Sequence, residues 1–151
     1  MYHYIFATQM KISESRYSKC MYFSANALAR KIEKLACDSW KRVNLSPSHA
    51  YLLMLAIEYP GVQPGTLANE LQLMPSTITR LTDKLEEKKL VVRITEGKVT
   101  NVYPTPKGKK LYSKLKECSK DFYETYASML GKEESARLVQ KINKLADKLH
   151  D

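Results

Sequence analysis

The sequence has little of what builds disulfide scaffolds, cofactor loops or membrane spans. Its 151 residues include three cysteines and five glycines. The cysteines are odd in number and widely spaced, with no CxxC pair, which argues against both a disulfide scaffold and a zinc ribbon. No apolar run approaches the roughly 18 residues of a transmembrane helix. The first ten residues lack the basic head and the cleavage site of a secretion signal, so we expect a cytoplasmic protein without a membrane partner.

The sequence also lacks the motifs that identify enzymes. It contains no glycine-rich phosphate loop, no HExxH, no Ser-His-Asp order and no paired-carboxylate spacing. No histidine is placed to activate a cysteine as a nucleophile. We therefore expect no catalytic residues, no metal and no cofactor.

What the chain does have is an excess of positive charge. Lysine and arginine number 25 against 16 acidic residues, which gives a net charge of +9. Residues 66–116 hold 11 basic and 5 acidic side chains, whereas residues 117–151 hold 6 and 7. A positive charge that is concentrated in the middle of the chain indicates a surface that binds a polyanion, because a charge that only keeps the protein soluble would be spread more evenly. Nucleic acid and an acidic membrane surface are both polyanionic partners of this kind.

The spacing of apolar residues predicts a mainly helical chain. Steps of three and four indicate a long amphipathic helix over about 15–43. A nearly all-apolar helix follows over 47–59, with Ser46 as its cap. Two short helices then begin at Pro64 and Pro75, and this arrangement is a helix-turn-helix.

After Leu90 the apolar period changes from 3.6 to 2. Two β-branched runs flank Glu96-Gly97-Lys98, which predicts a small hairpin whose Gly97 supplies the positive φ of the turn. Thr105 then caps a long helix that ends at Gly131, and a final amphipathic helix follows. A helix-turn-helix followed at once by a hairpin is a winged helix, in which the second helix enters the major groove of DNA.

Four motifs occur in a fixed order along the chain. They are Leu45-Ser46-Pro47, 63–68 (QPGTLA), 75–81 (PSTITRL) continued by 85–91 (LEEKKLV), and Thr105-Pro106-Lys107-Gly108. Together they resemble the MarR-type winged-helix transcriptional regulators, and the resemblance covers almost the whole chain. It implies a homodimer with interlocking terminal helices, bound to a palindromic operator on double-stranded DNA as a repressor. It also implies release by a small ligand or by cysteine oxidation.

The expected fold is therefore mainly α, with a winged helix-turn-helix, a two-stranded wing and dimerisation helices at both ends. Residues 1–44 are expected to form the N-terminal dimerisation helix. Residues 45–106 are expected to form the DNA-binding domain, and residues 107–151 the C-terminal dimerisation helices.

Helical spacing turns one face of the second short helix outward. If Ile78, Leu81 and Leu85 face inward, short hydroxyls near the helix N-terminus and an arginine face the solvent. Such hydroxyls suit phosphate contacts, and an arginine can bond guanine bidentately. On this helix the residues expected to contact DNA are Pro75, Ser76, Thr77, Thr79, Arg80 and Lys84. In the alternative interpretation, the hydroxyls only form hydrogen bonds with backbone groups of the first helical turn, and the arginine is a solvated surface residue.

The predicted wing departs from the family pattern. Family wings carry an Asp-x-Arg stretch near the tip, and its arginine enters the minor groove. Here the tip is shorter and carries Lys98 with no arginine. Lysine prefers narrow grooves less than arginine does, so we expect Lys98 and Arg93 to bind phosphates instead.

Candidates for a regulatory site lie in and after the first helix. Trp40, His49 and Tyr51 fall near the junction of the first two helices, where relatives bind aromatic or phenolic effectors. Cys20 lies near the sequence position at which peroxide-sensing relatives carry a reactive cysteine, so a thiol-based peroxide sensor is an alternative function. Core packing is the competing role for each of these residues.

An alternative from another class is a protein- or membrane-interaction module that does not bind DNA. Its positive charge would lie along one amphipathic helix. Here the charge is concentrated over a predicted helix-turn-helix and hairpin, which favours DNA.

Overall fold

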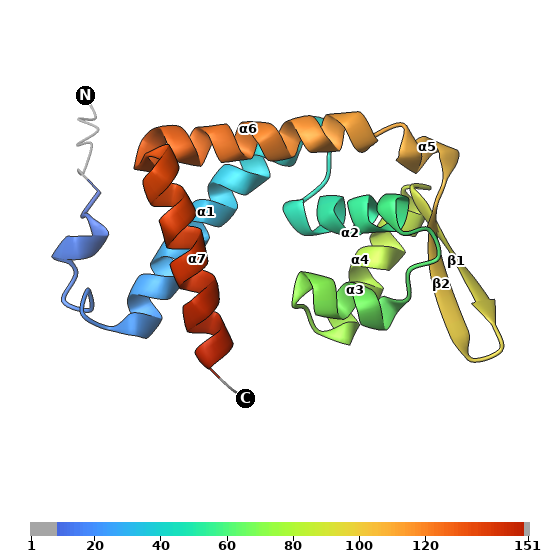
Figure 1. Ribbon diagram of the computed structural model, residues 1–151, viewed down its shortest axis with the longest axis horizontal. Helices are drawn as coiled ribbons and strands as arrows, with labels where there is room; N and C mark the ends of the chain where they lie inside the picture. Colours follow the sequence, from blue (N-terminus) through green and yellow to red (C-terminus); the bar gives the residue numbers. More distant parts are fainter. Residues whose placement is uncertain (1–8, 150–151) are drawn as a thin grey trace, which may run out of the picture. The chain divides into compact units, whose positions relative to one another are not determined.

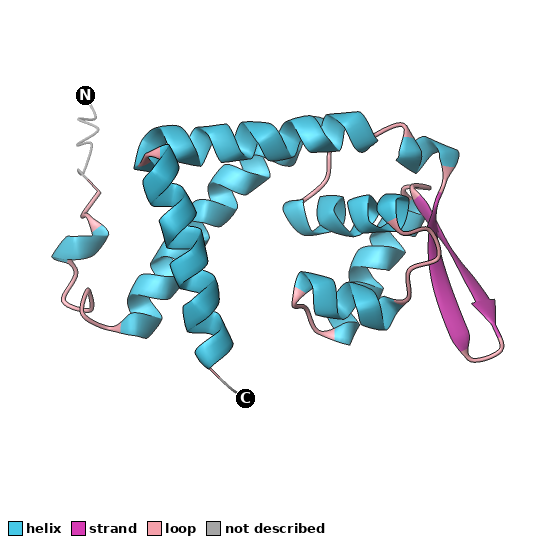
Figure 2. Cartoon of the chain, viewed as in Figure 1, coloured by secondary structure: helices cyan, strands magenta, loops and turns pink. Residues whose placement is uncertain are grey.

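The computed structural model describes residues 9–149, and the chain separates into two compact units, Met1–Lys34 and Leu35–Asp151. The first unit contains a short 3₁₀ helix, η1 (Ile12–Glu14), and most of α1 (Met21–Trp40). The second unit contains all the remaining elements, including the hairpin that holds both strands (Figure 2). The predicted class, mainly helical with a two-stranded wing and helices at both ends, is confirmed. The division at residues 44 and 106 stays a prediction.

The elements of the second unit follow the predicted order (Figure 1). A 3₁₀ turn, η2 (Lys41–Val43), ends the first helix. After it come α2 (Pro47–Glu58), α3 (Pro64–Leu71), α4 (Pro75–Glu87), β1 (Val91–Glu96), β2 (Val99–Pro104), α5 (Pro106–Lys109), α6 (Tyr112–Leu130) and α7 (Lys132–Lys148). Proline occupies the first position of each of α2, α3, α4 and α5, where the missing N–H costs nothing.

One apolar core joins the helix-turn-helix to the base of the hairpin. The largest fully buried side chains in it are Trp40, Leu52, Leu53, Leu67, Ile78, Leu85, Val91, Val102 and Leu115. They come from α1, α2, α3, α4, both strands and α6. The core therefore fixes α4 and the base of the wing on a common support.

The hairpin is antiparallel and closes with a two-residue turn. Its register runs from Val91 opposite Pro104 to Glu96 opposite Val99. Gly97 has a φ of 63°, so the predicted need for a positive φ in this turn is confirmed. Val62, between α2 and α3, forms an isolated bridge to Val102 and ties the base of the wing to the helix-turn-helix.

The first long helix begins later than its apolar pattern predicts. The expected start was about Ser15, but α1 begins at Met21. Ser15 Oγ accepts a hydrogen bond from the Tyr17 backbone N–H at 3.2 Å, and Ser24 Oγ donates to the Ser18 carbonyl at 3.2 Å. Serine side chains that bond nearby backbone groups compete with helix formation, and apolar spacing does not register this competition.

The helix predicted to start after Thr105 is interrupted. Thr105 caps α5 as expected, with its Oγ1 accepting from the Gly108 N–H at 3.0 Å. The chain then turns at Lys110 and Leu111 before α6 begins at Tyr112. Gly108 is buried against the Leu90 carbonyl, so α5 is held to the end of the helix-turn-helix and its axis cannot simply continue into α6.

Across the described part of the chain, no helix combines the length and the apolar character needed to span a bilayer.

Candidate nucleic-acid interface

The helix α4 presents the face that its sequence predicts. Ile78, Leu81 and Leu85 are buried, and these positions recur at steps of three and four. The side chains turned to solvent are Ser76, Thr79, Arg80, Asp83 and Lys84, whereas Thr77 is half-buried. Pro75, at the first position of the helix, is also exposed.

The N-terminus of α4 is open. Its cap residue, Met74, provides no side-chain hydrogen bond, and Met74 is itself 70% exposed. Thr79 Oγ1 donates to the Pro75 carbonyl at 3.1 Å, which leaves its hydroxyl oxygen able to accept. The positive dipole end of a helix N-terminus suits an anion such as a phosphate.

The cations of this surface differ in whether they are already paired. Arg80 is exposed and takes part in no ion pair within residues 9–149. Lys84 Nζ lies 3.2 Å from Glu87 Oε2. Lys98, at the tip of the wing, is exposed and is likewise in no ion pair of the described residues. Arg80 and Lys98 are therefore free to bind an external anion.

Arg93 has a different environment from the one expected. Its Nε lies 3.1 Å from Glu86 Oε2, and its Nη2 lies 2.5 Å from Asp83 Oδ1. These carboxylates raise the pKa of Arg93, above all through the hydrogen bond that its guanidinium donates to Glu86. Arg93 is thus held by two carboxylates of α4 instead of pointing freely to solvent, and its contact with phosphate stays a prediction. Sequence spacing gave no sign of this pairing, because the partners lie seven and ten residues away across a turn.

Two of the three predicted effector residues come together. The rings of Trp40 and Tyr51 meet edge to face with centroids 5.5 Å apart, and Phe122 of α6 lies 5.6 Å from Trp40. Trp40 is fully buried, and its Nε1 has no hydrogen-bond partner in the described part of the chain. Burial, with a smaller effect of Tyr126, raises the pKa of Tyr51, so its hydroxyl stays protonated near neutral pH.

His49 has another role. Its Nδ1 lies 2.5 Å from Oγ of Ser46, the residue that caps α2. Burial first, and then the ammonium groups of Lys88 and Lys84, lower the pKa of His49. His49 is therefore neutral near pH 7, and within residues 9–149 its side-chain hydrogen bond is to Ser46, at the start of α2.

The three cysteines differ in access. Cys20, immediately before α1, and Cys37 are exposed, whereas Cys118 is buried. Cys118 Sγ accepts a hydrogen bond from Arg42 Nε at 3.3 Å, and the same guanidinium lies 2.8 Å from Asp121. The sequence did not single out Arg42, because its partners are on α6, more than 70 residues away.

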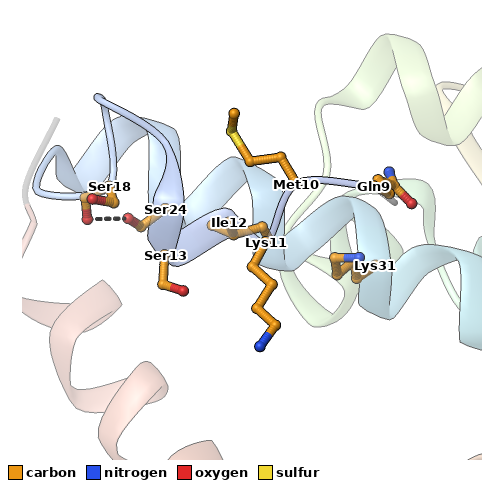
Figure 3. Close-up of a pocket in the computed structure, with 8 residues that line it drawn as sticks. All are labelled: Gln9, Met10, Lys11, Ile12, Ser13, Ser18, Ser24 and Lys31. Carbon is orange, nitrogen blue, oxygen red and sulfur yellow. Dashed lines mark hydrogen bonds between the residues drawn. The ribbon is translucent and has the colours of Figure 1, made fainter. Parts of the chain in front are cut away.

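A hollow of about 660 Å³ lies in the first unit, between the segment before α1 and α1 itself (Figure 3). Its lining residues are Gln9, Met10, Lys11, Ile12, Ser13, Ser18, Ser24 and Lys31. Figure 3 shows the ammonium group of Lys11 extending away from the backbone into open space. It also shows the hydrogen bond that Ser24 Oγ donates to the Ser18 carbonyl. The lining is mostly exposed side chains, so it is a surface hollow and not an enclosed binding cavity.

Comparison with known proteins gives consistent results. The family model described as "MarR family" matches residues 45–96, which span the helix-turn-helix and β1. The "HTH-type transcriptional repressor MdtR" of Bacillus subtilis (strain 168) is 25% identical over 126 residues, covering 82% of this chain and 81% of its own length.

Solved structures share the fold over most of the chain. The transcriptional repressor CouR bound to p-coumaroyl-CoA superposes with a TM-score of 0.80 at 17% identity, over 92% of this chain and 100% of that one. The S. aureus MepR–DNA complex gives a TM-score of 0.72 at 20% identity, over 85% of this chain and 98% of the other. At these identities the structural likeness establishes the fold alone.

Proposed function

We propose that the chain is a winged helix-turn-helix transcriptional repressor of the MarR type, which binds a palindromic operator as a homodimer and is released by a small aromatic or phenolic ligand. The match of the MarR family model to residues 45–96 and the similarity to the repressor MdtR support this proposal. The observation that carries the proposal is the outward face of α4. There Ser76 lies in the first turn of the helix, and Thr79 and Arg80 follow on the exposed face, with Arg80 in no ion pair of residues 9–149.

This face has the chemistry that base recognition requires. An unpaired arginine can donate two parallel hydrogen bonds to O6 and N7 of guanine in the major groove. Hydroxyls and the helix N-terminus can hold the flanking phosphates, which fixes the register of the helix on the duplex. Lys98, at the tip of the wing, would add a phosphate contact outside α4. Pro75, Thr77 and Lys84 border this surface and are proposed as supporting contacts.

The apolar side chains of α7 support a homodimer. Leu138, Val139, Ile142 and Leu145 are 37–50% exposed, and Leu149 just beyond the helix is 82% exposed. They recur at helical spacing along one stripe, and the only buried residue of α7 is Ser135. A long exposed apolar stripe is typical of an interface. An isologous interface between two copies places two recognition helices on one duplex and so requires a palindromic site.

Release by a ligand is proposed from the aromatic cluster of Trp40, Tyr51 and Phe122. It supplies an apolar surface, a protonated phenol and an orphaned indole N–H, which together suit an aromatic molecule with a hydrogen-bond acceptor. The CouR relative is described as bound to p-coumaroyl-CoA, and MdtR is named a transcriptional repressor. Both descriptions support, for this chain, a repressor that a small molecule controls.

Selection of bound duplexes from a random DNA pool tests the proposal. We expect an enriched inverted repeat whose half-sites lie about one helical turn apart, roughly 10 base pairs from centre to centre. Enrichment of a single half-site would contradict the dimer. Retention of the pool without enrichment would contradict specific recognition by α4.

A further inference from the structure

Arg93 of β1 is attached to the recognition helix α4 by three polar contacts. Its Nε donates to Glu86 Oε2 at 3.1 Å, and its Nη2 donates to Asp83 Oδ1 at 2.5 Å. The backbone N–H of Arg93 also donates to Glu86 Oε2 at 3.1 Å. The Glu86 carboxylate therefore accepts hydrogen bonds from both the side chain and the backbone of Arg93. These bonds fix the position of the β1 backbone as well as that of the arginine side chain.

The register of the hairpin explains why Arg93 reaches α4. Arg93 shares a face of the hairpin with Thr95 and Thr100, whose hydroxyls lie 3.1 Å apart. Val92 and Ile94 alternate with them along β1 and are more than 40% exposed. The face that carries Arg93 is thus the one turned toward the helix, while Val92 and Ile94 on the other face are exposed.

Apolar packing does not hold the outer wing against α4. The fully buried side chains of the hairpin end at Val91 on β1 and at Val102 on β2, and Val102 is the cross-strand partner of Arg93. Farther out, a hollow of about 360 Å³ separates the helix from the strands, and it is lined by Pro64, Ile78, Thr79, Thr82, Arg93, Thr95 and Thr100. An isolated two-stranded hairpin is only marginally stable in water. The Val62–Val102 bridge ties the base of the wing to the helix-turn-helix, and the network of Arg93 with Asp83 and Glu86 adds a second contact that can set the angle of the wing to α4.

We propose that Arg93 is a positioning residue that holds the wing at a fixed angle to the recognition helix, so that Lys98 and α4 meet the same duplex together. This inference rests on the proposed function, because the angle matters only when both elements bind DNA. Arg93, Asp83 and Glu86 together carry a net charge of −1. The group as a whole does not attract phosphate, and its contribution to binding comes from geometry.

The carboxylates provide the sharpest test, because charge and geometry predict opposite results. Replacing Asp83 and Glu86 by Asn and Gln removes two negative charges from the DNA-facing region and frees Arg93. If Arg93 were a phosphate contact, this double variant would bind a random-sequence duplex more tightly. If the network positions the wing, affinity falls by roughly five- to tenfold, in line with the coupling seen between residues of one polar network. The matched control is Glu87→Gln, on the same helix but paired only with Lys84, which should leave affinity unchanged or raise it.

Two further variants separate positioning from general loss of structure. Arg93→Gln in the Asp83→Asn, Glu86→Gln background should cost almost nothing more, because the network is already broken; a further tenfold loss would overturn the proposal. The exchanged pair Arg93→Glu with Glu86→Arg should recover part of the affinity that Arg93→Glu alone loses, and no recovery would count against a fixed wing angle.

The proposal is also testable without DNA. A double-mutant cycle on urea unfolding with Arg93→Gln and Glu86→Gln should give effects that do not add, since each change removes the same contact. Additive effects would overturn the network itself. If the wild-type chain bound no duplex while this cycle still showed coupling, the proposed function would fail and the attachment of the wing to α4 would stand.

Discussion

The position that a Cβ atom would occupy on Gly108 lies 2.2 Å from the carbonyl oxygen of Leu90. That carbonyl also accepts the backbone N–H of Thr105 at 3.0 Å, so it cannot move away easily. Gly108 has no positive φ, and its place in the chain is therefore explained by close packing and not by backbone conformation. It allows α5 to rest on the junction between the recognition helix and the wing.

Replacing Gly108 by alanine should destabilise the protein by about 3 kcal/mol, because the new methyl group must displace backbone. In an open helical site the same change would stabilise by up to about 1 kcal/mol. Gly65 of α3 provides that control, since nothing lies within 4 Å of its Cβ position. Urea unfolding of Gly108→Ala and Gly65→Ala measures the change in the free energy of unfolding for each variant. Equal changes would contradict the packing explanation.

The parts of this fold that local spacing determines could be predicted from the sequence, and the parts that depend on contacts across turns could not. The buried and exposed faces of α4 follow from helical period, as Ile78 and Arg80 illustrate. Arg93 and Lys98 were expected to bind phosphates because the short wing tip carries a lysine and no arginine for the minor groove. The pairing of Arg93 with Glu86 depends on the angle between helix and hairpin, and no sequence period encodes that angle.

Lys89 lies in the left-handed region, with a φ of 60°, at the turn between α4 and β1. This conformation costs a residue with a side chain roughly 1–2 kcal/mol, and replacement by glycine removes that cost. Because glycine also raises the entropy of the unfolded chain, part of this gain in stability is lost. We expect Lys89→Gly to raise the free energy of unfolding by about 1 kcal/mol.

The control for this change is Lys110→Gly, because Lys110 is also exposed but has an ordinary φ of −65°. That variant should lose stability by roughly 0.5–1 kcal/mol. If both glycine variants lowered the free energy of unfolding, strain at Lys89 would not be the cause.

Lys98 at the tip of the wing is expected to release one counterion when it meets a phosphate. Lys98→Ala should therefore make the slope of log K against log salt shallower by roughly one unit, with similar losses on any duplex sequence. Lys120 on α6, which pairs with Glu124, serves as the control, and its alanine variant should keep the wild-type slope. An unchanged slope for Lys98→Ala would mean that the wing tip does not touch DNA.

Cys20 is exposed, and no hydrogen bond to its sulfur is formed within the described residues. A reactive cysteine needs a stabilised thiolate, so we expect an organic peroxide to leave DNA affinity unchanged in the wild-type chain and in Cys20→Ser alike. Loss of affinity in the wild type that Cys20→Ser prevents would establish the thiol-based sensor instead of the ligand-controlled repressor.

The central claim is that the exposed face of α4 reads bases through Arg80. The most direct measurement compares the affinities of wild type, Arg80→Ala and Arg80→Lys for the selected inverted repeat and for a scrambled duplex at one salt concentration. Lysine keeps the charge but not the planar pair of donors. We predict that both variants lose about 1–3 kcal/mol on the inverted repeat, and that Arg80→Lys binds the scrambled duplex as the wild type does. Equal losses on the two duplexes, or full recovery by lysine on the inverted repeat, would show that Arg80 contacts only phosphate and would contradict the account.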